Sequence, residues 1–145
     1  MALNKPFENY ERPGVVVSYK VSNVKIFKGS FVGVNSSGFL VPMSHATASL
    51  KFVGIANESV DNTGGAPGEK SLNVTKTGSF VMKTASAFTP GIADLGKELY
   101  CLTDWEVQAT TVGLTNSYKI GTMVALETTS TGALGVRVRI SNYTV

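Results

Sequence analysis

This sequence has very little from which a catalytic site or a metal site could be built. Its 145 residues include one histidine, His45, one cysteine, Cys101, and one tryptophan, Trp105. No second cysteine or histidine stands beside either residue to complete a zinc ligand set. Cys101 lies between Tyr100 and Leu102 in an apolar segment, where a thiol behaves as a small hydrophobic side chain. The sequence therefore predicts no catalytic residue, no metal site and no cofactor.

Charge and long apolar runs are also scarce. Only 16% of the residues are charged, against about 25% in a typical globular protein. Lysine and arginine are scattered and the net charge is +3, so no basic run is present to follow a phosphate backbone. No apolar run approaches the roughly 20 residues that span a bilayer, and the N-terminus shows no secretory signal. We expect a protein made in the cytoplasm, with no nucleic-acid, membrane or small-molecule substrate partner.

What the sequence does contain is a strong strand pattern. Apolar and polar residues alternate over residues 15–22 and again over 136–140, and shorter stretches of the same kind lie between them. About ten short strands, separated by Gly, Asn and Ser turns and without a long helix, predict an all-β fold, either a barrel or a sandwich. We expect a single domain over residues 15–145.

Residues 1–14 differ from the rest of the chain. Pro6 and Pro13 argue against a helix interior or a central strand, so this stretch is predicted to form an extended N-terminal arm. Phe7 and Tyr10 are aromatic residues on an otherwise polar segment. They could anchor a partner, although a polar tail of this kind can equally be disordered.

One stretch imitates a phosphate-binding loop. Residues 64–71 resemble the pattern G-x-x-x-x-G-K-[ST], but Glu69 stands where the second glycine belongs. Its carboxylate would repel phosphate. A phosphate-binding loop also opens a helix, whereas residues 71–77 alternate like a strand. We interpret the stretch as an exposed, flexible loop.

Four acidic residues, Asp94, Glu98, Asp104 and Glu106, are close together in the sequence. Paired carboxylates can hydrolyse glycosides. The exposed aromatic residues on which sugars usually stack are few here, with Trp105 as the only tryptophan. The pattern favours a solvated acidic face over a sugar site.

A series of short motifs in a fixed order carries a resemblance to a known family. The motifs are 11–14 before the first strand, 24–32, 52–56, 74–81, 95–100, 120–121 and 136–140. Over most of residues 11–140 the chain resembles the small capsid decoration proteins of tailed phages, also called cement proteins. Residues 103–119 match nothing in the family pattern.

The resemblance implies a fold and a role. The fold is a small β-barrel-like domain similar to the β-tulip of lambdoid head decoration proteins. Such proteins bind the outer surface of the phage head as trimers, at three-fold and quasi-three-fold axes, and stabilise the expanded shell. By resemblance, this chain is a structural virion protein rather than an enzyme. Its partners are the major capsid protein and its own copies in a homotrimer.

Five residues are predicted to contact these partners. Phe7, Tyr10 and Arg12 on the arm are the candidate capsid-binding residues. Arg137 and Arg139 share one face of the last strand, where they suit contact with a neighbouring subunit or with the capsid. They could instead form a charged strand edge that prevents unwanted pairing. Both interpretations stay open.

Two other functions remain as alternatives. The chain could be a different virion β-module, such as a tail, spike or fibre-tip domain, which would be present in few copies per particle. It could also be a glycan- or ligand-binding β-module, which would bind glycans and have no affinity for capsids.

Overall fold

The computed structural model describes residues 15–140, and its regular structure is almost entirely β-strand. The twelve strands are β1 (Val16–Lys20), β2 (Lys25–Ile26), β3 (Phe31–Val34), β4 (Leu40–Pro42), β5 (Lys51–Ala56), β6 (Val60–Asp61), β7 (Ser71–Thr75), β8 (Gly78–Thr84), β9 (Glu98–Cys101), β10 (Glu106–Gln108), β11 (Lys119–Thr128) and β12 (Leu134–Ile140). A single 3-10 turn, η1 (Ile92–Asp94), precedes β9. The prediction of an all-β fold is confirmed. None of the helical structure in this range has the length and apolarity to cross a membrane.

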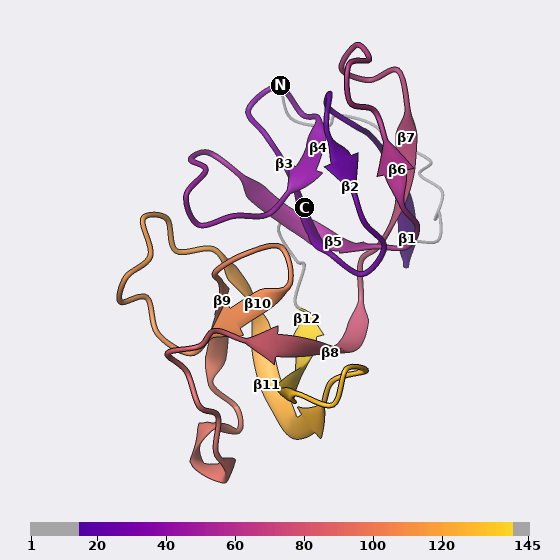
Figure 1. Cartoon of the computed structure of the whole chain (residues 1–145). Coiled ribbons are helices and arrows are strands. Elements are labelled where there is room, and N and C mark those ends of the chain that lie inside the picture. The colour runs from indigo at the N-terminus through magenta and orange to yellow at the C-terminus, as the bar shows by residue number, and fades with distance from the viewer. Residues whose placement is uncertain (1–14, 141–145) are drawn as a thin grey trace, which may run out of the picture.

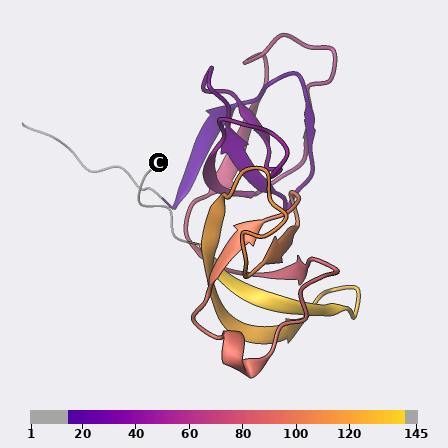
Figure 2. The same cartoon turned by 90° about the vertical axis from the view of Figure 1, so that its left-hand side faces the viewer.

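The strands form two units, which Figures 1 and 2 show one above the other. The sheet unit, residues 15–76, contains a five-stranded sheet in the order β1-β7-β5-β3-β4 and the small pair β2-β6. The ring unit, residues 78–140, contains five strands that pair in the closed order β10-β8-β12-β11-β9. A closed circuit of pairing therefore covers only the second half, and the chain as a whole is not one barrel.

The sheet unit curls around a core of its own. Just after β1, Val21 forms a parallel bridge with Leu40 of β4, and Ser22 N–H donates to the Leu40 carbonyl at 3.0 Å. This contact brings the two outer strands of the sheet together. The side chains enclosed by the curl are almost entirely removed from solvent: Val21, Ile26, Val32, Leu40, Val53, Ala56, Leu72 and Val74.

A bulge in β5 sends its apolar side chains to both faces of this sheet. Gly54 pairs with Val32 and Phe52 pairs with Gly33, so one extra residue lies between the two pairs. The insertion shifts the two-residue alternation of the strand. Phe52 and Ile55 thereby join the core of the ring unit, while Val53 belongs to the core of the sheet unit.

The ring unit closes through its shortest strand. β10 pairs in parallel with β8, through Glu106 and Lys83, and antiparallel with β9, through Val107 and Cys101. The remaining pairs around the ring are antiparallel. Inside lie apolar side chains of all five strands together with Phe31 and Phe52 of the sheet unit. These two rings meet edge to face, with centroids 6.0 Å apart and planes at 81°.

The connection from β10 to β11 fastens the two units together. The Tyr118 hydroxyl donates to the Thr47 carbonyl at 2.6 Å and accepts from Leu50 N–H at 3.1 Å. Asn116 Nδ2 donates to the His45 carbonyl at 2.8 Å. Part of the stretch 103–119, which matches no motif of the family pattern, thus binds the β4–β5 loop of the sheet unit.

Candidate functional site

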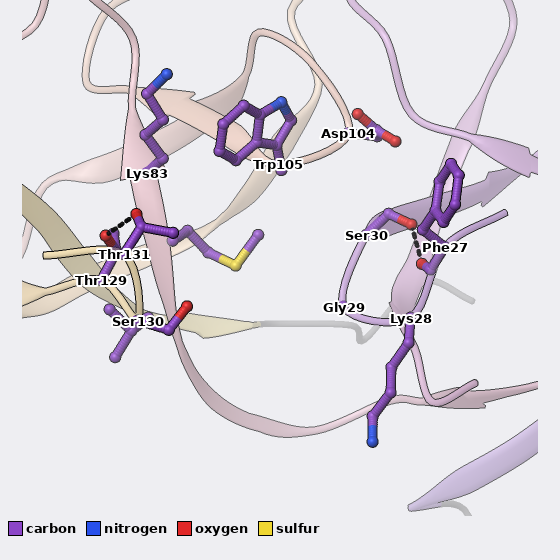
Figure 3. A pocket seen from close by; sticks show the side chains of 12 residues that line it. Phe27, Lys28, Gly29, Ser30, Lys83, Asp104, Trp105, Thr129, Ser130 and Thr131 are labelled. Atoms are coloured by element: carbon purple, nitrogen blue, oxygen red, sulfur yellow. Dashed lines mark hydrogen bonds between the residues drawn. The ribbon is translucent and has the colours of Figure 1, made fainter. Parts of the chain in front are cut away.

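A concave site lies at the junction of the two units, and we call it the junction groove (Figure 3). It encloses about 560 Å³, a volume typical of small-molecule sites. Four segments line it: residues 27–30 between β2 and β3, 81–83 of β8, 104–105 between β9 and β10, and 129–131 between β11 and β12. Segments that are far apart in the sequence therefore meet here.

The β2–β3 turn supplies one wall. Ser30 N–H and the Ser30 hydroxyl both donate to the Phe27 carbonyl, which closes the turn around Lys28 and Gly29. Gly29 N–H donates to the Ala56 carbonyl at 2.8 Å and fixes the turn on β5. The turn leaves the Phe27 ring 59% exposed, which is unusual for a large apolar side chain.

Trp105 supplies the aromatic part of another wall, and its side chain is 50% exposed. Lys83 Nζ lies 4.4 Å from the centre of the Trp105 ring and 3.5 Å from Glu106 Oε2. Leu102 N–H donates to the Glu106 carbonyl at 2.9 Å, which makes a tight turn over the residues between β9 and β10. The indole is thus held in place by its own loop and by a neighbouring cation.

Asp104 connects the two units and contributes a carboxyl group to the groove. Its main-chain carbonyl accepts from Phe31 N–H at 2.6 Å, across the junction. Burial raises the pKa of the Asp104 carboxyl above its ordinary value of 3.8, and the nearby Glu106 carboxylate raises it further. The side chain is therefore costly to ionise where it stands.

The β11–β12 turn gives the groove a row of hydroxyl groups. Thr129 N–H donates to the Ala133 carbonyl at 2.8 Å, and the Thr129 hydroxyl accepts from Ala133 N–H at 3.1 Å. Thr129 and Thr131 hydroxyls are 3.0 Å apart, and Ser130 lies between these residues. Val81, 43% exposed, and the buried Met82 line the groove from β8.

The acidic residues that are close in the sequence do not form one site. Glu98 lies 2.6 Å from Lys119 Nζ, and Asp94 lies 2.7 Å from Lys97 Nζ. These lysine hydrogen bonds are the main reason that the pKa of each carboxyl lies below its ordinary value. Within residues 15–140, no three His, Cys, Asp or Glu side chains come close enough together to hold a metal ion.

The predicted contact residues fall in two places. Phe7, Tyr10 and Arg12 lie outside the described residues. Arg137 and Arg139 are exposed on the outer face of β12, and Arg137 Nε is 3.5 Å from Glu127 Oε1. β12 pairs with β8 on one side and with β11 on the other, so the interpretation of these arginines as a charged strand edge is wrong.

The single cysteine and the imitation phosphate loop have structural roles. Burial, with a contribution from Asp104, raises the pKa of the Cys101 thiol to about 12, so Cys101 stays protonated and unreactive at neutral pH. Glu69 Oε2 accepts a hydrogen bond from Ala66 N–H at 2.9 Å. This main-chain N–H is therefore already bonded within the loop and is not available to a phosphate. Strand β7 begins at Ser71, as the alternation over 71–77 predicts.

Sequence reasoning missed the junction groove because its aromatic residues belong to different units. Phe27 follows a two-residue strand and Trp105 lies in a turn, so neither is part of a pattern. The one available signal was the placement of Trp105 between Asp104 and Glu106, which is unusual for a core tryptophan. A scan against protein-family models, a search of curated proteins and a search of solved structures each found no match.

Proposed function

We propose that this chain is a capsid decoration protein. It binds the outer surface of a phage head as trimers at three-fold and quasi-three-fold axes and stabilises the expanded shell. The ordered series of motifs supports this role, and an all-β body is compatible with it.

The observation that carries the proposal is the position of β1. This strand pairs along its length with β7 alone among the described strands, and it follows directly on residues 1–14. Val15 is 56% exposed and Val16 is 43% exposed, at the beginning of this outer strand. An outer strand whose second edge pairs with no described strand suits pairing with a strand of another chain.

A chain of 14 residues reaches at most about 45–50 Å when extended. That distance is enough for Phe7, Tyr10 and Arg12 to contact a neighbouring capsid subunit. Each such contact is weak because ordering the arm costs conformational entropy. Three arms on one trimer compensate, since the second and third contacts become intramolecular.

The outer face of the ring unit offers a second contact surface. Arg137 pairs in register with Val81 of β8, and Arg139 lies two residues further along β12. An exposed apolar side chain beside two guanidinium groups has the composition found in protein interfaces. This surface suits contact between copies of the chain or with the shell.

Deletion of residues 2–12 tests the proposal. We expect the truncated protein to keep its melting temperature and to lose binding to expanded, undecorated shells. Arg137→Ala is the companion variant, and it separates the arm from the ring surface. Light scattering of the intact protein should give about three times the 15.3 kDa chain mass.

Two results would contradict the role. One is a full-length chain that neither binds expanded shells nor forms trimers. The other is a particle that carries the protein in only a few copies, which would assign it to a tail, spike or fibre tip.

A further inference from the structure

We propose that the junction groove is a binding site for a neutral saccharide. This function is separate from capsid decoration and does not depend on it. The inference rests on three properties of the groove, namely its aromatic surface, its hydrogen-bonding groups and its balance of charge.

The aromatic surface comes from Phe27 and Trp105, which are 59% and 50% exposed. A lysine ammonium group lies over each ring, Lys25 over Phe27 and Lys83 over Trp105, so the other face of each ring is the one available for packing. A pyranose ring has one face of C–H groups, and such a face packs on an aromatic ring. Both side chains are attached to turns that main-chain hydrogen bonds hold in place. Little conformational entropy remains to be lost when a ligand packs on them.

The polar groups are numerous for a site of this size. Seven of the twelve lining residues carry a hydroxyl, carboxyl or ammonium group. In Figure 3, Asp104 and Ser30 lie on the side of Phe27, while Thr129 and Thr131 lie on the opposite side. Hydroxyl groups on both sides, with a carboxyl group on one, match a ligand whose rim carries hydroxyls in several directions.

The charges in the groove favour a neutral ligand. The Lys83 ammonium group lies 3.5 Å from the Glu106 carboxylate, which balances it. The Lys25 ammonium group, 4.9 Å from the centre of the Phe27 ring, is likewise balanced by Asp61 at 4.0 Å. Among the lining residues one further charge of each sign remains, on Lys28 and Asp104. A phosphate would meet the Asp104 carboxylate, and an organic cation would meet the Lys28 ammonium group.

The same composition argues against an apolar peptide segment as the ligand. A peptide side chain that filled the groove would remove Asp104 and the hydroxyls of the β11–β12 turn from water. The Thr129 and Thr131 hydroxyls already bond to each other, but an apolar group could not bond the Asp104 carboxyl or the lone pairs that these hydroxyls have left, and unpaired buried polar groups are costly. A saccharide hydroxyl can bond both. Little in the sequence points to this site, since only the fold brings Phe27 and Trp105 to line the same groove.

Trp105 makes the test direct, because it is the only tryptophan in the chain. The isolated full-length protein is first applied to an array of neutral hexose and N-acetylhexosamine oligosaccharides, with sialylated and sulfated glycans as the charged set. The neutral oligosaccharide with the highest signal is then titrated while Trp105 fluorescence is recorded. We expect a saturable change with neutral glycans and a weaker response to the charged set.

Variants identify the surface that binds. We expect Phe27→Ser and Trp105→Ala each to weaken binding about tenfold, measured by calorimetry because the second variant removes the fluorophore. Asp104→Asn keeps Trp105 and should weaken binding less. Val112→Ser is the matched control, since Val112 is 80% exposed and lies outside the groove; it should bind like the parent.

Three results would overturn the inference. The first is the absence of any neutral-glycan signal on the array. The second is glycan binding that Phe27→Ser and Trp105→Ala leave unchanged while circular dichroism shows an intact fold. The third is saturable quenching of Trp105 by a Leu/Phe-rich peptide without any response to saccharides, which would assign the groove to protein contact.

Discussion

The two units of this protein use their strands in opposite ways. In the sheet unit, β3 and β5 are buried on both faces, and every residue of β5 after Lys51 is buried. In the ring unit, the outer face of β12 stays in solvent, with Arg137 and Arg139 exposed and the alternate residues Val136, Val138 and Ile140 buried. Strands β3 and β5 therefore form a central layer between two cores, whereas β12 of the ring unit keeps a free outer surface.

The difference predicts where the molecule accepts change. A strand between two cores has no side that can relax into solvent, so small changes in β5 should affect the whole fold. Outer residues of the ring and of the turns contact few neighbours. The proposed contact surface and the junction groove are both built from such outer residues, where substitutions should affect stability less.

The largest expected effect is at Gly54. A Cβ at this position would lie 2.3 Å from the Thr75 carbonyl oxygen, and the residue has a φ of +150°, which side chains rarely adopt. We expect Gly54→Ala to lower the free energy of unfolding by about 3 kcal/mol or more, measured by urea denaturation.

Gly38→Ala is the control for Gly54. Gly38 also has a positive φ, +84°, but no atom lies within 4 Å of the added methyl group. Gly38→Ala should therefore lower the free energy of unfolding only by the cost of a side chain in a left-handed backbone conformation, about 1–2 kcal/mol. Equal losses for the two variants would contradict a close approach of β5 and β7 at Gly54.

Substitution of two core leucines tests whether the sheet unit and the ring unit have separate hydrophobic cores. Leu72 of β7 and Leu99 of β9 are both fully buried, but in different cores. Each change to alanine should cost about 2–5 kcal/mol. The ring core includes Ile55, so Leu99→Ala should also speed hydrogen exchange at that residue, whereas Leu72→Ala should leave the ring amides protected. Loss of ring protection in Leu72→Ala would show that the cores are not separate.

Removal of the Tyr118 hydroxyl tests whether its hydrogen bonds hold the ring unit to the sheet unit. Tyr118→Phe removes its contacts with Thr47 and Leu50, which should cost about 1–2 kcal/mol and speed exchange of the Leu50 amide. Tyr100→Phe removes only an exposed bond to Glu98 and should have a much smaller effect. Equal losses of stability and equal Leu50 exchange rates in the two variants would contradict a role of Tyr118 in holding the two units together.

The smallest expected effects concern two carboxyls with opposite pKa shifts. The pKa of Glu98 is lowered by its bond to Lys119, so its contribution to stability is present at neutral pH and is lost as the pH falls through the lowered pKa. The pKa of Asp104 is raised by burial, so its contribution is fully present below its ordinary pKa and is lost as the pH rises through the raised value.

It follows that Glu98→Gln should destabilise the protein slightly at neutral pH, while Asp104→Asn should stabilise it. Both differences should shrink in acid, below the pKa values of the two groups. Melting temperatures at pH 7 and pH 3 measure this. A stabilising Glu98→Gln or a destabilising Asp104→Asn at neutral pH would reverse the assigned signs.

Local patterns in the sequence were sufficient to predict the position of several strands. Alternation over 15–22 and 136–140 predicted β1 and β12, and the alternation after Glu69 predicted β7. The apolar residues around Cys101 likewise pointed to a buried thiol. These features depend on the two-residue period of a strand, which the sequence displays directly.

Only the tertiary structure decided how the strands are divided and what lies between the two units. The bulge at Val53 redirects the side chains of β5, and the pairing of β10 with both β8 and β9 closes the ring, yet neither can be read from a local period. The junction groove depends on the two units bringing Phe27 and Trp105 to line the same cavity. Such contacts join residues far apart in the chain, so their geometry is fixed by packing rather than by any local pattern of residues.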